Sequence, residues 1–260
     1  TTYTYGETGY INPHAPTQIG ATTLTYDNNG NVLTKGSINY TWDYRNRMTA
    51  TGQGGATTTY AYDHTYERVK KVGSTTTYYP SDLYSKEGAT TTRFIFGNGE
   101  LLATIEGNGT ATSTRYYHPD HLGSTRLVTD GSGVGVQAID YYPYGNPRID
   151  NGPYDSDRTY IGEMYDEGPQ LSYLNARYMD SKRGQFLSQD PMFWGNQNLI
   201  NPQSMNSYSY AENNPITKED PTGLQSKQVK QLKTIISLLK SVISILSGKS
   251  NVSIGKIDNN

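Results

Sequence analysis

Short runs of alternating apolar and polar residues, separated by turn residues, recur along the first half of the chain. Residues 57–62 (TTTYAY) and 75–79 (TTTYY) are two such runs, and this alternation is typical of a half-buried β-strand. Three runs end in an aromatic residue followed by an aspartate, and these aspartates are Asp27, Asp43 and Asp63. A turn rich in polar residues follows each aspartate, which indicates a β-hairpin. The pattern therefore predicts a repeating array of hairpins.

The composition supports a β-rich chain. Its 260 residues include 24 Tyr and 27 Gly but only 4 Phe, and 33% of them are hydrophobic. Tyr and Thr suit a half-wetted pleated surface, and Gly suits tight turns. A single hairpin buries too little surface to be stable, so we expect the hairpins to pair edge to edge. The chain begins with Thr rather than Met, so we expect it to be a fragment or a processed product, with more repeats before it.

The net charge and the amino-acid composition argue against several classes of function. The net charge is −2, which gives no electrostatic footprint for nucleic acid, so no nucleic-acid partner is expected. The basic run at residues 68–71 alternates with apolar positions and is predicted to be the exposed face of a strand. The chain contains no cysteine, which excludes disulfides and cysteine-based sites. No cofactor is expected.

From about Arg115 the repeats give way to a series of longer motifs in a fixed order. They are HPDHLGS at 118–124, YYPYG at 141–145, YIGEMYD at 160–166, LNARYMD at 174–180, GQFLSQDP at 184–191, NSYSYAENNP at 206–215 and DPTGL at 220–224. This series resembles the repeat-associated core of the Rhs (YD-repeat) family, in which the core follows a run of YD repeats. The resemblance covers the chain from about residue 20 to residue 224.

The resemblance implies a mainly β fold, in which a ribbon of YD-repeat hairpins winds as part of a hollow shell that an Rhs core plug closes. We predict hairpins over residues 1–114, the core over 115–224 and a variable tail over 225–260. Tc-toxin C subunits and teneurins belong to this family, and bacterial members enclose a C-terminal segment that is usually a toxin. The expected protein is thus part of a secreted or cell-surface bacterial shell. Its expected partners are its own upstream shell and its tail as cargo.

The resemblance also implies one chemical activity, a single self-cleavage in the manner of an aspartic peptidase. Asp190 and Asp220 would be the two aspartates, and the cut would fall between Leu224 and Gln225. Arg183 is a candidate to replace an arginine that family members carry nearby. Two carboxylates held close together cannot both ionise, so one can act as an acid while the other activates water. The alternative is that both Asp-Pro pairs only begin turns.

Two further features leave alternatives open. His118, Asp120 and His121 have a spacing compatible with metal ligation, but in the resembling family this motif begins the core, and no metal is predicted. Residues from about 227 to 247 place apolar side chains three or four positions apart, which predicts a short amphipathic α-helix. This helix would pack inside the shell or lead into a toxin. The alternative is that its basic face contacts a membrane.

A second function belongs to a different class. The repeats would form a non-enzymatic cell-surface or fibre-forming scaffold, and its Tyr-rich faces would mediate adhesion by binding glycans. Exposed aromatic ladders motivate this interpretation. Glycans and a secretion apparatus are therefore the remaining candidate partners.

Overall fold

The computed structural model describes residues 2–6, 13–193, 201–224 and 226–228. Sixteen strands form one antiparallel sheet, and their order in space follows their order along the chain. The first eight strands are β1 (Tyr3–Thr4), β2 (Gln18–Ile19), β3 (Thr22–Tyr26), β4 (Val32–Lys35), β5 (Ile38–Trp42), β6 (Met48–Gln53), β7 (Ala56–Tyr62) and β8 (Arg68–Val72). The others are β9 (Thr76–Ser81), β10 (Tyr84–Glu87), β11 (Thr90–Gly97), β12 (Glu100–Gly107), β13 (Thr112–Pro119), β14 (Thr125–Asp130), β15 (Gly135–Tyr141) and β16 (Pro147–Asn151).

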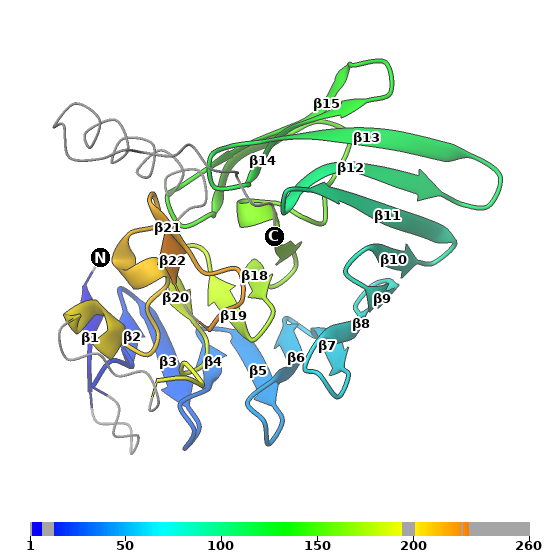
Figure 1. Cartoon of the computed structure of the whole chain (residues 1–260). Coiled ribbons are helices and arrows are strands. Elements are labelled where there is room, and N and C mark those ends of the chain that lie inside the picture. The colour runs from blue at the N-terminus through cyan, green and yellow to red at the C-terminus, as the bar shows by residue number, and fades with distance from the viewer. Residues whose placement is uncertain (1, 7–12, 194–200, 225, 229–260) are drawn as a thin grey trace, which may run out of the picture.

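This sheet, which we call the ribbon, bends around a smaller sheet (Figure 1). The smaller sheet, the core sheet, has the order β17 (Met164–Asp166), β18 (Leu171–Leu174), β19 (Arg177–Asp180) and β20 (Gln185–Phe186). The remaining elements are the 3-10 helices η1 (Tyr160–Gly162), η2 (Pro202–Met205) and η3 (Ala211–Asn213) and the strands β21 (Lys218–Glu219) and β22 (Lys227–Gln228). The predicted mainly β hairpin ribbon is confirmed. Residue 115, the predicted start of the core, lies inside β13, and the ribbon continues to β16.

The turns of the predicted repeats share one arrangement. In the first, Oδ1 of Asp27 accepts hydrogen bonds from the backbone N–H groups of Asn29 (2.9 Å) and Asn31 (2.8 Å), and Gly30 takes a φ of 82°. Asp43 and Asp63 accept the same two hydrogen bonds, and the residues equivalent to Gly30 are Asn46 and Tyr66, with φ values of 60° and 77°. A left-handed residue after a tight turn produces the bulge that begins each returning strand. The aspartates therefore set the register of the ribbon.

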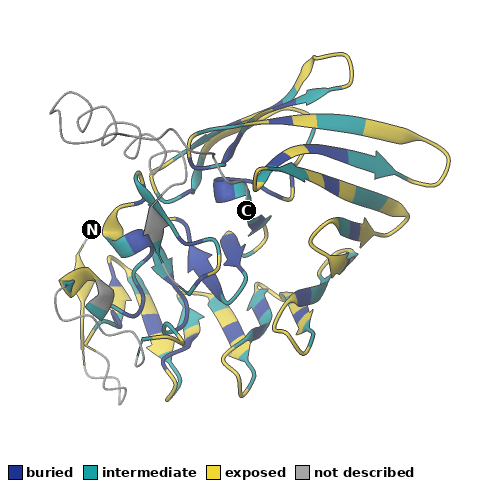
Figure 2. Ribbon diagram, in the orientation of Figure 1, coloured by how far each residue is buried: buried dark blue, intermediate teal, exposed yellow. Residues whose placement is uncertain are grey.

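The core sheet fills the concave side of the ribbon. Every residue of β18 and β19 is buried (Figure 2). One apolar cluster joins the two sheets, with Leu24, Val32, Tyr40, Met48, Tyr60 and Tyr79 from the ribbon and Met164, Leu171, Tyr173, Tyr178 and Leu187 from the core side. Each fully buried apolar side chain of this kind contributes about 1.5–3 kcal/mol. The alternating tyrosines of the repeats therefore hold the core sheet in place.

Polar contacts also join the ribbon to the core. The N–H of Val32 donates to the carbonyl oxygen of Leu187 at 2.8 Å. Nη1 of Arg68 lies 2.6 Å from Oδ2 of Asp166, and Arg68 is 4% exposed. The prediction that the basic run at 68–71 lies on an exposed face is therefore wrong for Arg68, because this arginine has a carboxylate partner on the core sheet.

The predicted tail helix lies almost wholly outside the described residues. Its first two residues form β22, which pairs with β21 in the antiparallel sense. Among the residues that the structure describes, no helix has the length and apolar character needed to cross a membrane.

Candidate active site

The two predicted aspartates meet at a single arginine. Asp190 follows β20, Asp220 follows β21, and Arg177 belongs to β19. Nη2 of Arg177 lies 3.5 Å from Oδ2 of Asp190 and 3.4 Å from Oδ2 of Asp220. The core sheet therefore brings together two carboxylates that are 30 residues apart in the sequence.

Arg177 is enclosed by other groups of the core. Its guanidinium carbon lies 3.5 Å from the centre of the Phe186 ring, and its side chain is 3% exposed. Nη1 donates to the carbonyl oxygen of Ser207 at 3.1 Å, and Nε donates to that of Gly223. Burial lowers the pKa of Arg177, whereas the carboxylates of Asp190 and Asp220 oppose that shift. Arg177 thus links both aspartates to the backbone at Ser207 and at Gly223.

The two aspartates differ in their surroundings. The side chain of Asp190 is 24% exposed, whereas that of Asp220 is 2% exposed. Burial raises the pKa of Asp190, and the nearby Asp220 adds to the increase. The charge of Arg177 and the N–H of Met192, which donates to Oδ1 of Asp190 at 2.8 Å, oppose the increase. Asp190 therefore keeps a proton more readily than an ordinary aspartate does.

The segment 220–224 is held against the turn between β18 and β19. Oδ1 of Asp220 accepts the backbone N–H of Leu224 at 3.2 Å. Gly223 has a φ of 65°, and a Cβ atom there would lie 2.4 Å from the carbonyl oxygen of Leu174. Only glycine combines this left-handed backbone with such a close approach. The backbone immediately before Gln225 is therefore fixed beside the two aspartates, while Gln225 itself lies outside the described residues.

Arg183, the arginine considered for this site, lies elsewhere. Its Nη1 atom is 2.9 Å from Oδ2 of Asp180. Arg177 is the arginine at the aspartates, and sequence reasoning did not single it out. The available signal was its position in LNARYMD, a charged residue inside a strand flanked by apolar positions, which is typical of a paired buried charge.

The three residues of the possible metal motif have separate partners. Oδ1 of Asp120 accepts the N–H groups of Leu122 and Ser124 at 2.9 and 3.0 Å, as the repeat aspartates do in their turns. Nε2 of His118 lies 3.1 Å from Oγ1 of Thr129, and Nε2 of His121 lies 3.1 Å from the carbonyl oxygen of Ile216. Within the described part of the chain, no group of three potential ligands is arranged to hold a metal ion.

Both the sequence and the fold of this chain are similar to those of known proteins. Residues 14–216 match the teneurin YD-shell family. The tRNA3(Ser)-specific nuclease WapA of Bacillus spizizenii is 31% identical over 223 residues, which cover 80% of this chain and 9% of that protein. The tRNA nuclease WapA of Bacillus subtilis is 31% identical over 229 residues, with the same two coverages.

Solved structures support the same assignment at the level of the fold. The crystal structure of TcdB2-TccC3-TEV has a TM-score of 0.60 and 18% identity, over 78% of this chain and 13% of that chain. The chain therefore spans a small part of each of these relatives. Because the family match covers most of the hairpin ribbon and the core, the chain belongs to the teneurin YD-shell family of Rhs/YD-repeat shell proteins.

Proposed function

We propose that the chain is the C-terminal, closing part of a bacterial YD shell and that it cuts itself once, after Leu224. Membership of the teneurin YD-shell family supports the proposal that the chain is part of a shell. We call the arrangement of Asp190, Asp220 and Arg177 the aspartate site. The observation that supports cleavage is that this site contacts the backbone just before the bond between Leu224 and Gln225. Asp220 accepts the N–H of Leu224 at 3.2 Å, and Arg177 donates to the carbonyl oxygen of Gly223. A catalytic carboxylate must lie within reach of the bond it cuts.

The proposed reaction is hydrolysis of the peptide bond between Leu224 and Gln225. Asp220 takes a proton from a water molecule, whose oxygen bonds to the carbonyl carbon of Leu224. Asp190, with its raised pKa, donates a proton to the nitrogen of Gln225 as the C–N bond breaks. The products are a carboxylate on Leu224 and a free amine on Gln225. Arg177 positions both carboxylates throughout.

The segment from Gln225 onward is the proposed cargo. The WapA relatives carry names that describe tRNA nucleases, and this chain spans 9% of their length. We therefore propose that further YD repeats of the same protein continue the ribbon and complete an enclosure. A toxin role in bacterial competition and a secreted or cell-surface location complete the proposal, and the nuclease activity that the names of the WapA relatives describe supports the toxin role.

Substitutions at the three charged residues test the cut. We expect Asp190→Asn and Asp220→Asn to slow the appearance of two fragments by about 100-fold or more, the usual contribution of an acid or base. Arg177→Gln should slow it as well. Arg183→Gln is the matched control, because Arg183 pairs with Asp180 and not with the aspartate site. Time courses by intact-mass spectrometry measure the rates, and unchanged cutting in both aspartate variants would remove this pair from the mechanism.

One surface feature favours the second candidate function, a glycan-binding adhesion scaffold. Tyr44 is 81% exposed and Tyr66 is 50% exposed. The guanidinium carbon of Arg45 lies 5.2 Å from the centre of each ring. A glycan array with the Tyr44→Ala/Tyr66→Ala double variant tests it, with Tyr142→Ala as an exposed-tyrosine control. Binding that the double variant retains would exclude this surface.

A further inference from the structure

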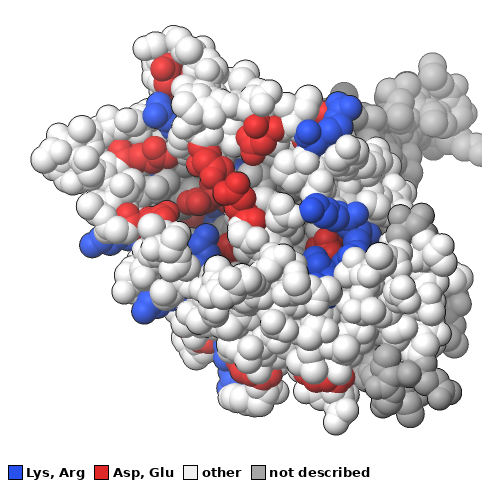
Figure 3. Space-filling view, turned by 180° about the vertical axis from the view of Figure 1, so that it is seen from behind, with Lys and Arg blue, Asp and Glu red and all other residues white. Residues whose placement is uncertain are grey.

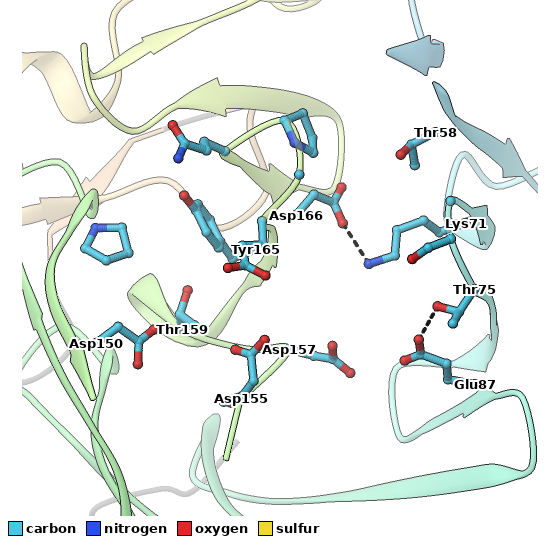
Figure 4. A pocket seen from close by; sticks show the side chains of 18 of the residues that line it. Thr58, Lys71, Thr75, Glu87, Asp150, Asp155, Asp157, Thr159, Tyr165 and Asp166 are labelled. Carbon is cyan, nitrogen blue, oxygen red and sulfur yellow. Dashed lines mark hydrogen bonds and ion pairs between the residues drawn. The ribbon is translucent and has the colours of Figure 1, made fainter. Parts of the chain in front are cut away.

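Acidic side chains gather on the face of the molecule seen in Figure 3. A cavity of about 610 Å³ lies where the ribbon, its edge strand β16 and the core sheet meet (Figure 4). Its acidic lining residues are Glu87 from β10, Asp150 from β16, Asp155 and Asp157 from the segment after β16, Asp166 from β17 and Glu167 just beyond it. The cationic lining residues are Lys71 and Lys182. The carboxylates therefore outnumber the positive charges around this cavity.

The positive charges near the cavity are already engaged. Nζ of Lys71 lies 3.3 Å from Oδ1 of Asp166, whose other oxygen binds Arg68. Nζ of Lys182 donates to the side chain of Gln170. Three of the carboxylates, those of Asp155, Asp157 and Glu167, have no hydrogen bond or ion pair with any described residue. The negative charge between the ribbon and the core sheet is therefore not fully balanced by the positive charges nearby.

The backbone holds two of these carboxylates in the cavity. The carbonyl oxygen of Asp157 accepts the N–H of Tyr165 in β17 at 3.0 Å. Ser156, between Asp155 and Asp157, is buried, and its N–H donates to Oε1 of Gln137 in β15 at 3.1 Å. The segment that carries Asp155 and Asp157 is thus attached to the ribbon on one side and to the core sheet on the other. The two carboxylates remain close to the other acidic groups, as Figure 4 shows.

Desolvation by the surrounding protein is the main effect that raises the pKa of each of these two aspartates. Asp155 is exposed to solvent in the open cavity, yet the protein atoms around its carboxyl group desolvate it and raise its pKa. The carboxylates of Glu167, Asp150 and Asp157 add to the increase, and Lys71 opposes it.

Asp157 has different charged neighbours. Asp157 is also exposed to solvent in the cavity. Desolvation by the surrounding protein raises its pKa, and Glu87 and Asp166 add to the increase, whereas Lys71 and Arg68 oppose it. Tyr165 and Lys182 are the other titratable groups that line the cavity. A group whose pKa is raised by folding stabilises the fold in its protonated form, and that stability is lost as pH rises through the raised value.

We propose that this cavity is a pH-sensitive joint between the ribbon and the core sheet. When its carboxylates are ionised, their mutual repulsion loosens residues 152–159, which connect the two sheets. When they are protonated, the repulsion disappears and the joint tightens. The core is therefore held more firmly in mild acid than at neutral pH. This device does not depend on the proposed cut, because it uses none of the residues at the aspartate site.

Thermal unfolding of the full-length chain tests the proposal. The double variant Asp155→Asn/Asp157→Asn should unfold about 2–4 °C higher than wild type at about pH 7.5. The difference should shrink as the pH is lowered, because the wild-type carboxylates, whose pKa values are raised, gain protons. The control is Asp82→Asn, an exposed aspartate outside this cavity. A double variant that melts at or below the wild-type temperature, or that keeps the wild-type pH dependence, would overturn the proposal.

Hydrogen exchange on the unmodified chain gives a second test that needs no variant. After correction for the intrinsic pH dependence of exchange, amides in residues 152–159 should be more protected at about pH 5 than at about pH 7.5. Amides in β3 should not change in the same direction, because neither β3 nor its neighbours β2 and β4 contribute a residue to the cavity lining. Equal protection of residues 152–159 at both pH values would contradict a pH-sensitive joint.

Discussion

Asp166 is the carboxylate that ties the core sheet to the ribbon, so the change Asp166→Asn measures the strength of that connection. Oδ2 lies 2.6 Å from Nη1 of Arg68, and Oδ1 lies 3.3 Å from Nζ of Lys71. The side chains of Asp166 and Arg68 are 2% and 1% exposed, so water screens their attraction little. Asparagine keeps the shape but leaves the guanidinium of Arg68 buried without its carboxylate. Breaking a buried pair in this way costs about 3–5 kcal/mol.

Asp140 offers a matched control, because it also contacts two basic side chains. Its partners are Arg126 and Arg148, whose side chains are 40% and 56% exposed. Solvent and salt screen such a surface pair, and each flexible arginine loses entropy when it is held in place. Asp140→Asn should therefore destabilise the chain far less than Asp166→Asn does, although both changes remove one negative charge from an ion-paired aspartate.

Equilibrium urea unfolding, followed by tryptophan fluorescence to which the half-buried Trp42 contributes, compares the two variants with wild type. We expect Asp166→Asn to lower the free energy of unfolding by about 3–5 kcal/mol. Raising the salt concentration should reduce the small effect of Asp140→Asn and leave that of Asp166→Asn nearly unchanged. The reasoning is refuted if the two variants lose equal stability, or if Asp166→Asn loses less than about 1 kcal/mol.

Two glycine substitutions test the close packing around the core. A Cβ at Gly145 would lie 2.2 Å from the Tyr160 ring, whereas at Gly133, with a similar positive φ, nothing lies within 4 Å. Gly133→Ala should lower the free energy of unfolding by about 1–2 kcal/mol because of its backbone conformation alone. Gly145→Ala should lower it by about 1–3 kcal/mol more, because the Tyr160 ring must also move. Equal losses of stability in urea unfolding would contradict the packing argument. Gly223→Ala should push the segment 220–224 away from Leu174 and slow the self-cleavage by about 100-fold. Mass spectrometry that shows cutting at the wild-type rate would exclude this effect.

Local features of the fold were predictable because their causes lie within a few residues. Asp27 accepts hydrogen bonds from Asn29 and Asn31 inside its own turn, so the sequence of that turn contains the whole interaction. Tyr66 departs from this rule, because it occupies the left-handed position that Gly30 fills in the first repeat. A bulky residue is disfavoured there, and propensity alone does not predict it.

The partners of buried charges were not predictable, because they depend on contacts between distant segments. Arg68 and Asp166 are 98 residues apart, and the alternation around Arg68 indicated only an exposed strand face. The same limit applies to Arg177, whose two aspartates come from later parts of the chain. Family resemblance indicated Asp190 and Asp220, but only the folded core shows that an arginine lies between them. The helix expected in the tail stays a prediction.

The identity of the first residue after the cut tests the central claim most directly. Purified full-length chain, incubated until cutting stops, should give a C-terminal fragment whose mass and N-terminal sequence begin at Gln225. The Asp190→Asn chain, incubated for the same time, should remain almost entirely at full length. A wild-type chain that stays intact, or a fragment that begins at any other residue, would contradict self-cleavage at this site.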